Sequence, residues 1–241
     1  MDGIQRCSRY AFGPNRLHYC GPDANREILA YLKEGITDFG LKKLLTQFNT
    51  MYPYLHQIAL SNNIADPFES RVVEAYWIGN SLLENVSPKA FYHHLIDEHH
   101  MKKRLDIKSF SQLKEKVRKG ALPHHSFHVF NIWKRTGHTR SIHTLESIDA
   151  CRISWGKVFS VDGPKLMVGT RPIKSAANKL ILSSPIKKEV VRHLESEIDE
   201  VKVGDTISIH WETPCEILSL PQVENLEKYT LLSLQFTNQN L

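Results

Sequence analysis

The sequence is poor in cysteine and has no long apolar run. Its 241 residues include four cysteines, at positions 7, 20, 151 and 215. Four dispersed thiols do not make a disulfide framework, so we expect thiols or metal ligands in a reducing compartment. No segment approaches the ~18 apolar residues that cross a membrane, and the N-terminus lacks an apolar stretch of signal-peptide length. We therefore expect a cytoplasmic protein with no membrane contact.

A strong charge imbalance is also absent. The formal net charge is +5, and the basic residues are spread along the chain in short runs. A nucleic-acid groove needs a basic stripe and aromatic side chains placed regularly on strands, and the sequence shows neither. An OB-type nucleic-acid binder is therefore the weakest of the functional classes we consider, and we expect no nucleic-acid partner.

The signatures of several common enzyme classes are missing. The chain has no His-Glu-x-x-His zinc-protease pattern, no Gly-rich nucleotide-binding loop and no Gly-x-Ser-x-Gly nucleophile turn. What it does have is histidine. Nine of its thirteen histidines lie between residues 93 and 143.

Two kinds of periodicity divide the chain near residue 147. Before that point, apolar residues recur at helical spacing, and Ser87-Pro88 has the composition of a helix start. From residue 151 they alternate, with Asp162-Gly163-Pro164 as a turn. The sequence predicts an α+β protein with an all-helical, histidine-rich domain over residues 1–147. A small antiparallel, OB-like β-barrel is predicted over residues 148–241, ending in a strand at 229–236 and able to fold without the helical part.

The first 22 residues carry two Gly-Pro turn signals, Gly13-Pro14 and Gly21-Pro22. These signals predict a loop-like segment. Two roles stay open for it: shaping a cleft, or forming a plain cap between the domains.

The histidine-rich part contains candidate metal ligands. If the segment around residue 126 is helical, His124 and His128 are four residues apart and share a face, a spacing that chelates zinc on helices. If it is extended, the same two side chains again share a face, and periodicity does not decide between helix and strand. We predict a metal site at His124 and His128, with further ligands available from the histidines at 93, 94, 99, 100 and 125.

A second candidate site joins Cys151 to His210. Cys151 opens the β-rich part, and Val203-Gly204-Asp205 leads into an alternating strand that ends on His210. In an antiparallel sheet the start of one strand and the end of its neighbour lie at the same edge, about 4.8 Å apart. A thiolate and an imidazole are ligands for soft or borderline metals. A buried thiol and a strand-end histidine of an ordinary barrel would give the same pattern.

These residues resemble the HypC family of small nickel–iron hydrogenase maturation chaperones. Cys151 with Gly156-Lys157-Val158 is similar to the family's first motif, and Val203-Gly204-Asp205 with His210 is similar to its second. The resemblance covers about residues 150–241. It implies an OB-like barrel, and it implies that Cys151 and His210 handle an iron atom bearing cyanide and carbon monoxide. The implied partners are a maturation scaffold protein and the immature hydrogenase large subunit.

The chain departs from that family in four places. Cys151 is internal, whereas the family's cysteine becomes N-terminal, and Trp155 stands where the family has proline. Trp211-Glu212-Thr213 replaces the family's Gly-Phe-Ala, and the predicted strand at 229–236 replaces its C-terminal helix. Two functions follow: an accessory metallochaperone of hydrogenase maturation, or a metal-dependent enzyme whose site is the histidine-rich domain, with the barrel as a docking module.

Overall fold

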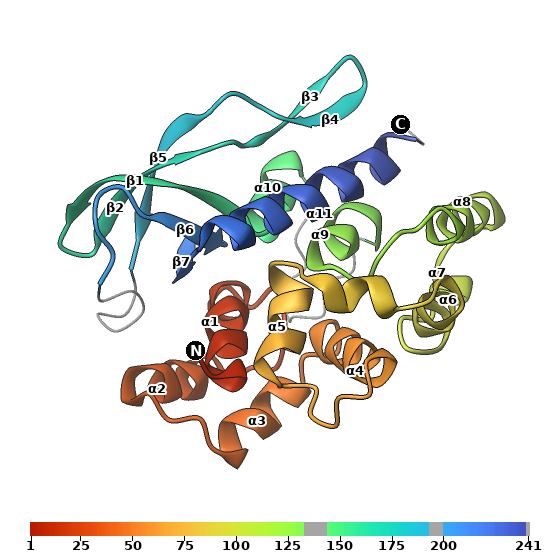
Figure 1. The fold of residues 1–241 in the computed structure, drawn as a ribbon, viewed down its shortest axis with the longest axis horizontal. Coiled ribbons are helices and arrows are strands. Elements are labelled where there is room, and N and C mark those ends of the chain that lie inside the picture. The colour runs from red at the N-terminus through yellow and green to blue at the C-terminus, as the bar shows by residue number, and fades with distance from the viewer. Residues whose placement is uncertain (133–143, 193–199, 240–241) are drawn as a thin grey trace.

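The protein has a mixed α+β fold in which helices form most of the first half and a sheet follows (Figure 1). The computed structural model describes residues 1–132, 144–192 and 200–239, so His138 and His143 of the histidine-rich part lie outside the described residues. In the described part of the chain, no helix is both long enough and apolar enough to span a membrane. The α+β class predicted from the sequence is confirmed.

The helical half is built from short elements, most of which have a polar side chain at the N-terminus. Ser87 accepts a hydrogen bond from the backbone N–H of Ala90, with Pro88 in the first turn, as the sequence predicts. The elements are α1 (Gly3–Arg16), α2 (Asn25–Glu34), α3 (Phe39–Thr46), α4 (Met51–Ser61), α5 (Ser70–Trp77), η1 (Ser81–Asn85), α6 (Pro88–Asp97), α7 (Met101–Arg104), α8 (Ile107–Arg118), α9 (His125–Phe127), η2 (His128–Ile132) and α10 (Leu145–Cys151).

The N-terminal segment is a helix, so the predicted loop over residues 1–22 is wrong for most of its length. Asp2 caps α1 by accepting hydrogen bonds from the backbone N–H groups of Ile4 and Gln5. Gly13 and Pro14 lie within the last turn of α1 and are buried. Tertiary packing therefore overrides the local turn preference of the Gly-Pro pair, which the sequence alone does not reveal.

The β-rich part forms an open antiparallel sheet instead of a closed barrel. Its strands are β1 (Ser154–Asp162), β2 (Lys165–Thr170), β5 (Ile186–Val191), β6 (Thr206–His210) and β7 (Thr213–Ile217), in the order β5-β2-β1-β6-β7. Strands β3 (Ile173–Ala176) and β4 (Lys179–Leu182) form a separate two-stranded ribbon. Within the described residues, β5 and β7 are edge strands with no ladder between them, so the barrel is not closed.

The C-terminal segment is the helix α11 (Leu220–Asn238), so the predicted final strand is wrong. Ser219 and Gln222 form a capping box, and Pro221 lies in the first turn. The buried positions recur at helical spacing: Leu226, Tyr229, Thr230, Ser233, Leu234 and Thr237. The apparent alternation within residues 229–236 is therefore part of a helical pattern that is too short to be recognised there. The chain has a C-terminal helix, so the predicted departure from the HypC family at this position is not present.

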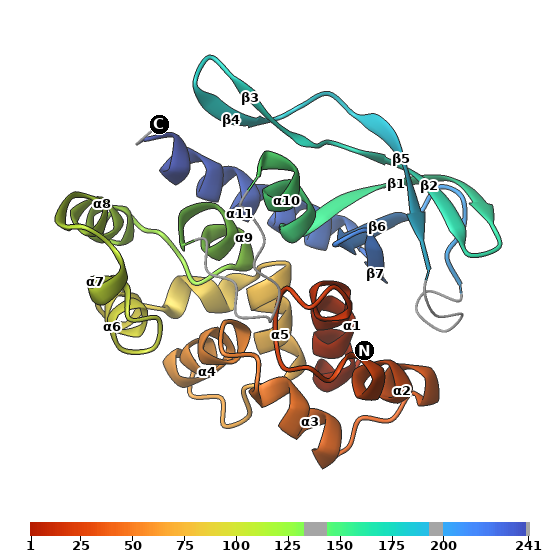
Figure 2. The same cartoon turned by 180° about the vertical axis from the view of Figure 1, so that it is seen from behind.

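Helix α11 packs against the helical half and joins the two parts of the chain (Figures 1 and 2). In both views it lies between the β3–β4 ribbon and the helices of the first half. Leu226, Tyr229 and Phe236 belong to the same apolar cluster as the cores of α1, α4 and α5. The predicted boundary at residue 147 falls inside α10, and the division into two domains stays a prediction.

A fragment of residues 145–241 tests how far the two parts depend on each other. Because this fragment exposes the side chains of Leu226, Tyr229 and Phe236, which the helical half covers, we expect it to melt at a lower temperature and less cooperatively than the whole chain. This expectation reverses the independent folding predicted from the sequence. Thermal melts followed by circular dichroism would measure it, and equal, equally sharp transitions would show that the shared core is dispensable.

Candidate metal centre

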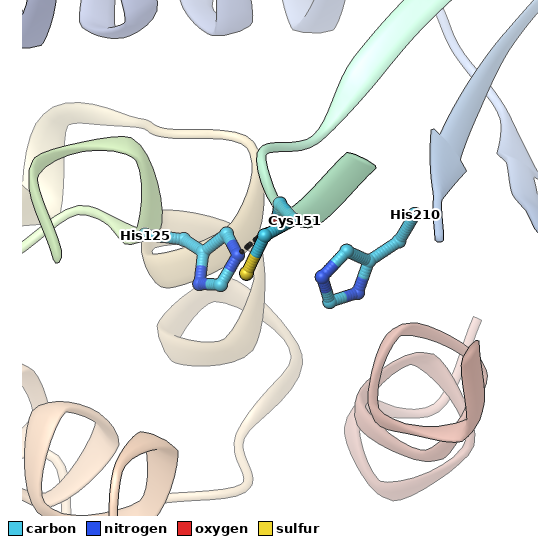
Figure 3. A group of neighbouring side chains, drawn as sticks. All are labelled: His125, Cys151 and His210. Atoms are coloured by element: carbon cyan, nitrogen blue, oxygen red, sulfur yellow. Dashed lines mark hydrogen bonds between the residues drawn. The ribbon is translucent and has the colours of Figure 1, made fainter. Parts of the chain in front are cut away.

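Three side chains from distant parts of the sequence converge in the interior (Figure 3). His125, Cys151 and His210 each offer one ligand atom, and these atoms all lie within 4.8 Å of one another. The residues are 5%, 8% and 1% exposed, respectively. The predicted pair Cys151 and His210 is therefore brought together, and His125 from the helical half completes a group of three.

Pairing between β1 and β6 brings Cys151 beside His210. The two strands run antiparallel with Ser154 opposite Ile209, so the start of β1 and the end of β6 lie at one edge of the sheet. One residue beyond β6, the backbone N–H of Trp211 donates to the carbonyl of Ala150 at 2.8 Å. This hydrogen bond extends the alignment past the ladder and fixes the end of α10 against the end of β6.

The turn after His210 adopts a conformation that is unusual for its residues. Trp211 and Glu212 have φ values of 50° and 65°, in the left-handed region, and they connect His210 to Thr213 in a two-residue hairpin. A bulky residue seldom adopts this conformation, and such positions cluster at functional sites. The ring of Trp211 lies 4.5 Å from that of Tyr19, centroid to centroid, which holds the turn in place.

His210 presents a lone pair to the site. Its Nδ1 lies 2.6 Å from the backbone carbonyl of Tyr10, and since a carbonyl only accepts, Nδ1 carries the proton. The other nitrogen, Nε2, is buried and has no hydrogen bond of standard geometry to any described residue, and the nearby carbonyl of Cys151 raises the pKa of the ring. Metal-binding histidines commonly donate one ring N–H to a carbonyl while the second nitrogen faces the metal. The arrangement of His210 therefore fits metal binding through Nε2.

His125 occupies the opposite side and is held at both ring nitrogens. Its Nε2 donates to the carbonyl of Cys151 at 2.8 Å, and its Nδ1 accepts from the hydroxyl of Tyr76 at 3.1 Å. Because a hydroxyl both donates and accepts, the proton of His125 can move from Nε2 to Nδ1 without leaving Nδ1 unpaired. Metal binding at Nε2 would replace the bond to Cys151 and retain the bond to Tyr76.

Burial keeps both imidazoles neutral. It lowers the pKa of His210 to about 4 and holds the pKa of His125 well below its usual range, and the neighbouring His210 lowers the pKa of His125 further. The rings of His125 and His210 contact each other edge to face at 5.1 Å, centroid to centroid, and the ring of Trp77 packs beside both, 4.6 Å from His125 and 5.4 Å from His210. Neutral imidazole is the form that binds metals, so no deprotonation of histidine is required at neutral pH.

The donor set suits a borderline transition metal. One thiolate and two imidazoles are ligands that zinc, iron and copper accept, whereas magnesium and calcium prefer oxygen. Three protein ligands leave a fourth tetrahedral position for a water or another small ligand. A metal bound by Cys151 would displace the thiol proton, because the thiolate is the ligating form.

His124 and His128 do not join this group, so the structure separates the predicted pair from the ligand cluster. His124 caps α9 by accepting from the backbone N–H of Ser126, and its ring stacks on Tyr229 at 5.2 Å. His128 interacts with the hydroxyl of Tyr54 at 3.1 Å. The four-residue rule assumes a continuous α-helix, but α9 has three residues and the π-helix η2 follows it.

A second group of buried histidines surrounds Tyr54. The ring of Tyr54 lies 4.6 Å from that of His94, 4.8 Å from that of His99 and 5.5 Å from that of His128. Across the part of the chain that the structure describes, only the His125–Cys151–His210 group brings three such ligand atoms within 4.8 Å of one another. The group around Tyr54 therefore belongs to the packed aromatic core of the helical half.

The comparisons with known proteins identify a family but no activity. The family model described as "Family of unknown function (DUF6390)" matches residues 1–241. No curated protein and no solved structure matches the chain. The match includes the helical and the β-rich parts together, so all three converging residues lie within a single family match.

The buried histidines make the free energy of unfolding decrease in mildly acidic solution. Burial lowers the pKa of His94 and His124 to about 3 and that of His210 to about 4, from a usual value near 6.5. Between these limits the unfolded chain binds protons that the folded chain does not, so stability falls as the pH falls below 6.5. We expect the free energy of unfolding to decrease by up to about 1.4 kcal/mol per pH unit for each such histidine.

Urea unfolding between pH 7.5 and 4.5 would measure this dependence. His124→Asn keeps a capping oxygen but removes one titrating ring, so its slope against pH should be shallower than that of the wild type. His93→Gln is the matched control, because the side chain of His93 is 57% exposed. A wild-type stability that does not change across this range would contradict the burial of neutral histidines.

Proposed function

Because the chain belongs over its whole length to DUF6390, a family of unknown function, we propose its role from the site: it binds one iron ion, as an accessory metallochaperone of nickel–iron hydrogenase maturation. The convergence of Cys151, His210 and His125 carries the proposal. Cys151 and His210 are the two residues of the HypC-like motifs. The proposed setting is the cytoplasm, where a reducing environment preserves the thiol.

Each ligand has a distinct part in the proposal. Cys151 supplies the anionic sulfur, which forms the strongest bond to iron and offsets part of its charge. His210 and His125 supply neutral nitrogens, and the open position admits a small ligand such as cyanide or carbon monoxide. The proposed partners are a maturation scaffold protein, which delivers the iron, and the hydrogenase large subunit, which receives it.

We also propose that the β-rich part is related in fold to the OB-like barrel of the HypC family. The five-stranded sheet carries the two motif segments on neighbouring strands, β1 and β6. A C-terminal helix, which that family has, follows the sheet here as α11. These two features support a common origin of the β-rich part, although the sheet stays open at β5 and β7.

The alternative is a metal-dependent enzyme whose site lies in the histidine-rich half, with the β-rich part as a docking module. One observation favours it: His125 comes from that half and lies in the ligand group. His124 and His128, the ligands that the sequence predicts for this enzyme, contact Tyr229 and Tyr54 and do not join the group. In this alternative the open coordination position would hold a reacting water in place of a diatomic ligand.

Metal binding by single variants tests the site. We expect the wild type to bind one divalent ion, with iron, cobalt and zinc as probes, and Cys151→Ser to lose most of this binding because serine ionises too poorly to ligate. His210→Ala and His125→Ala should weaken binding less, since each removes a neutral ligand. Anaerobic calorimetry and the sulfur-to-cobalt charge-transfer band would measure the affinity and the presence of the thiolate.

Two controls make this test specific. Cys20→Ser removes a partly exposed thiol outside the ligand group, and the His124→Ala, His128→Ala double variant removes the histidines of the alternative. Both should bind metal like the wild type. Equal binding by Cys151→Ser and the wild type would refute the site, and loss of binding in the double variant alone would favour the alternative.

The cargo is tested on protein purified without oxygen. We expect iron in the wild type, infrared bands of bound cyanide and carbon monoxide, and retention of a hydrogenase large subunit or scaffold protein in a pull-down. Cys151→Ser should lose the iron and these bands while its circular dichroism stays unchanged. Metal binding without diatomic bands or partner retention would reject the maturation role and leave the metal site standing.

A further inference from the structure

We infer that the Gly13-Pro14 step in α1 positions His210, by freeing the backbone carbonyl of Tyr10 to hold the histidine in its metal-binding tautomer. This inference deepens the proposed function and rests on it. It explains why a Gly-Pro pair, which is unfavourable inside a helix, lies within α1. Three features of α1 support it: a missing N–H donor at Pro14, a close approach at Gly13 and a fixed carbonyl at Tyr10.

Pro14 removes the donor that would occupy the carbonyl of Tyr10. In an α-helix each carbonyl accepts from the N–H four residues later, and for Tyr10 that residue is Pro14, which has no N–H. The carbonyl of Tyr10 instead accepts from Nδ1 of His210 at 2.6 Å. A proline near the end of α1 thus redirects one hydrogen bond from the helix to the site.

Gly13 allows the two backbones to come close enough for this bond. A Cβ atom at position 13 would lie 2.5 Å from the carbonyl oxygen of His210, far inside normal contact. The same atom would lie 3.4 Å from Cβ of Trp211. Residue 13 is therefore the point where α1 rests on the end of β6, and any side chain there would push His210 away from Tyr10.

Tyr10 itself is held by contacts independent of its carbonyl. Its hydroxyl donates to Glu216 at 2.8 Å and also contacts Ser208, and its ring stacks on Trp77 at 5.2 Å. Arg6, one turn earlier in α1, forms an ion pair with Glu216 at 3.2 Å. These contacts join α1 to β6 and β7, so the carbonyl of Tyr10 is a fixed acceptor.

The consequence concerns the proton of His210. With Nδ1 held as a donor, Nε2 keeps its lone pair and is available to a metal before the metal arrives. Without this constraint the imidazole could place its proton on either nitrogen, and the form with the proton on Nε2 could not ligate from that side. The Gly13-Pro14 step thereby preorganises the ligand without contacting the metal.

Pro14→Ala tests the inference in the full chain. The variant restores an N–H that competes with His210 for the Tyr10 carbonyl, so we expect a mixture of the two tautomers and a loss of zinc and cobalt affinity of about tenfold or more. Long-range proton–nitrogen NMR correlations of His210 in metal-free protein report the tautomer directly. Calorimetry reports the affinity, and circular dichroism confirms folding.

Two variants separate positioning from a general structural effect. Pro221→Ala changes a proline in the first turn of α11, where the N–H has no helical acceptor, and it should leave tautomer and affinity unchanged. Tyr10→Phe keeps the carbonyl but loses the hydroxyl bonds, so it should lower the melting temperature while His210 stays protonated on Nδ1.

The outcomes distinguish this inference from the proposed function. If the wild-type protein binds no metal, the metal site is refuted. A shift of the His210 tautomer in Pro14→Ala would still support the positioning role in that case. A folded Pro14→Ala variant with the wild-type tautomer overturns the inference. A wild-type protein whose His210 carries its proton on Nε2 also overturns the inference, whatever its metal affinity.

Discussion

The antiparallel pairing of β1 with β6 is the constraint on which the site depends. Its register places Ser154 opposite Ile209, and the hydrogen bond from Trp211 to Ala150 carries the alignment one step beyond the ladder. A slip by one residue would turn the side chain of His210 to the other face of the sheet, away from Cys151 at the end of α10. The hydrogen bond from Trp211 to Ala150 opposes such a slip, and the two-residue turn at Trp211-Glu212 separately fixes the register of β6 with β7.

The helical half contributes the rest of the site through contacts that are distant in sequence. Tyr10 of α1 orients His210, Tyr76 of α5 contacts His125, and Trp77 packs beside both imidazoles. The site is thus an interface between helices and sheet. Its two imidazoles are buried and neutral, and Tyr76 and Trp77, which contact them, belong to an apolar core shared by both parts of the chain.

The sequence predicts well the features that depend on local patterns or on the order of the strands. The alternation after residue 151 predicted β1, β2 and β6, and strand adjacency was enough to bring Cys151 to His210. His125 was harder, because its place depends on a three-residue helix followed by a π-helix, where the four-residue rule that favoured His124 and His128 does not hold. The helices α1 and α11 were mispredicted for a related reason: a Gly-Pro pair and a short alternating segment are local signals, and tertiary packing overrode both.

The contact between α9 and α11 has a consequence for the order in which the protein is completed. Ser126, beside His125, packs against Thr230, and α11 covers α9. The segment that supports His125 therefore leaves the ribosome after His210, whereas α1 with its acceptor for His210 leaves before it. Domains generally fold as they emerge, from the N-terminus onward. A nascent chain whose α11 has not yet emerged can therefore carry Cys151 and His210 without a settled His125, and the three side chains converge only after α11 has packed on α9.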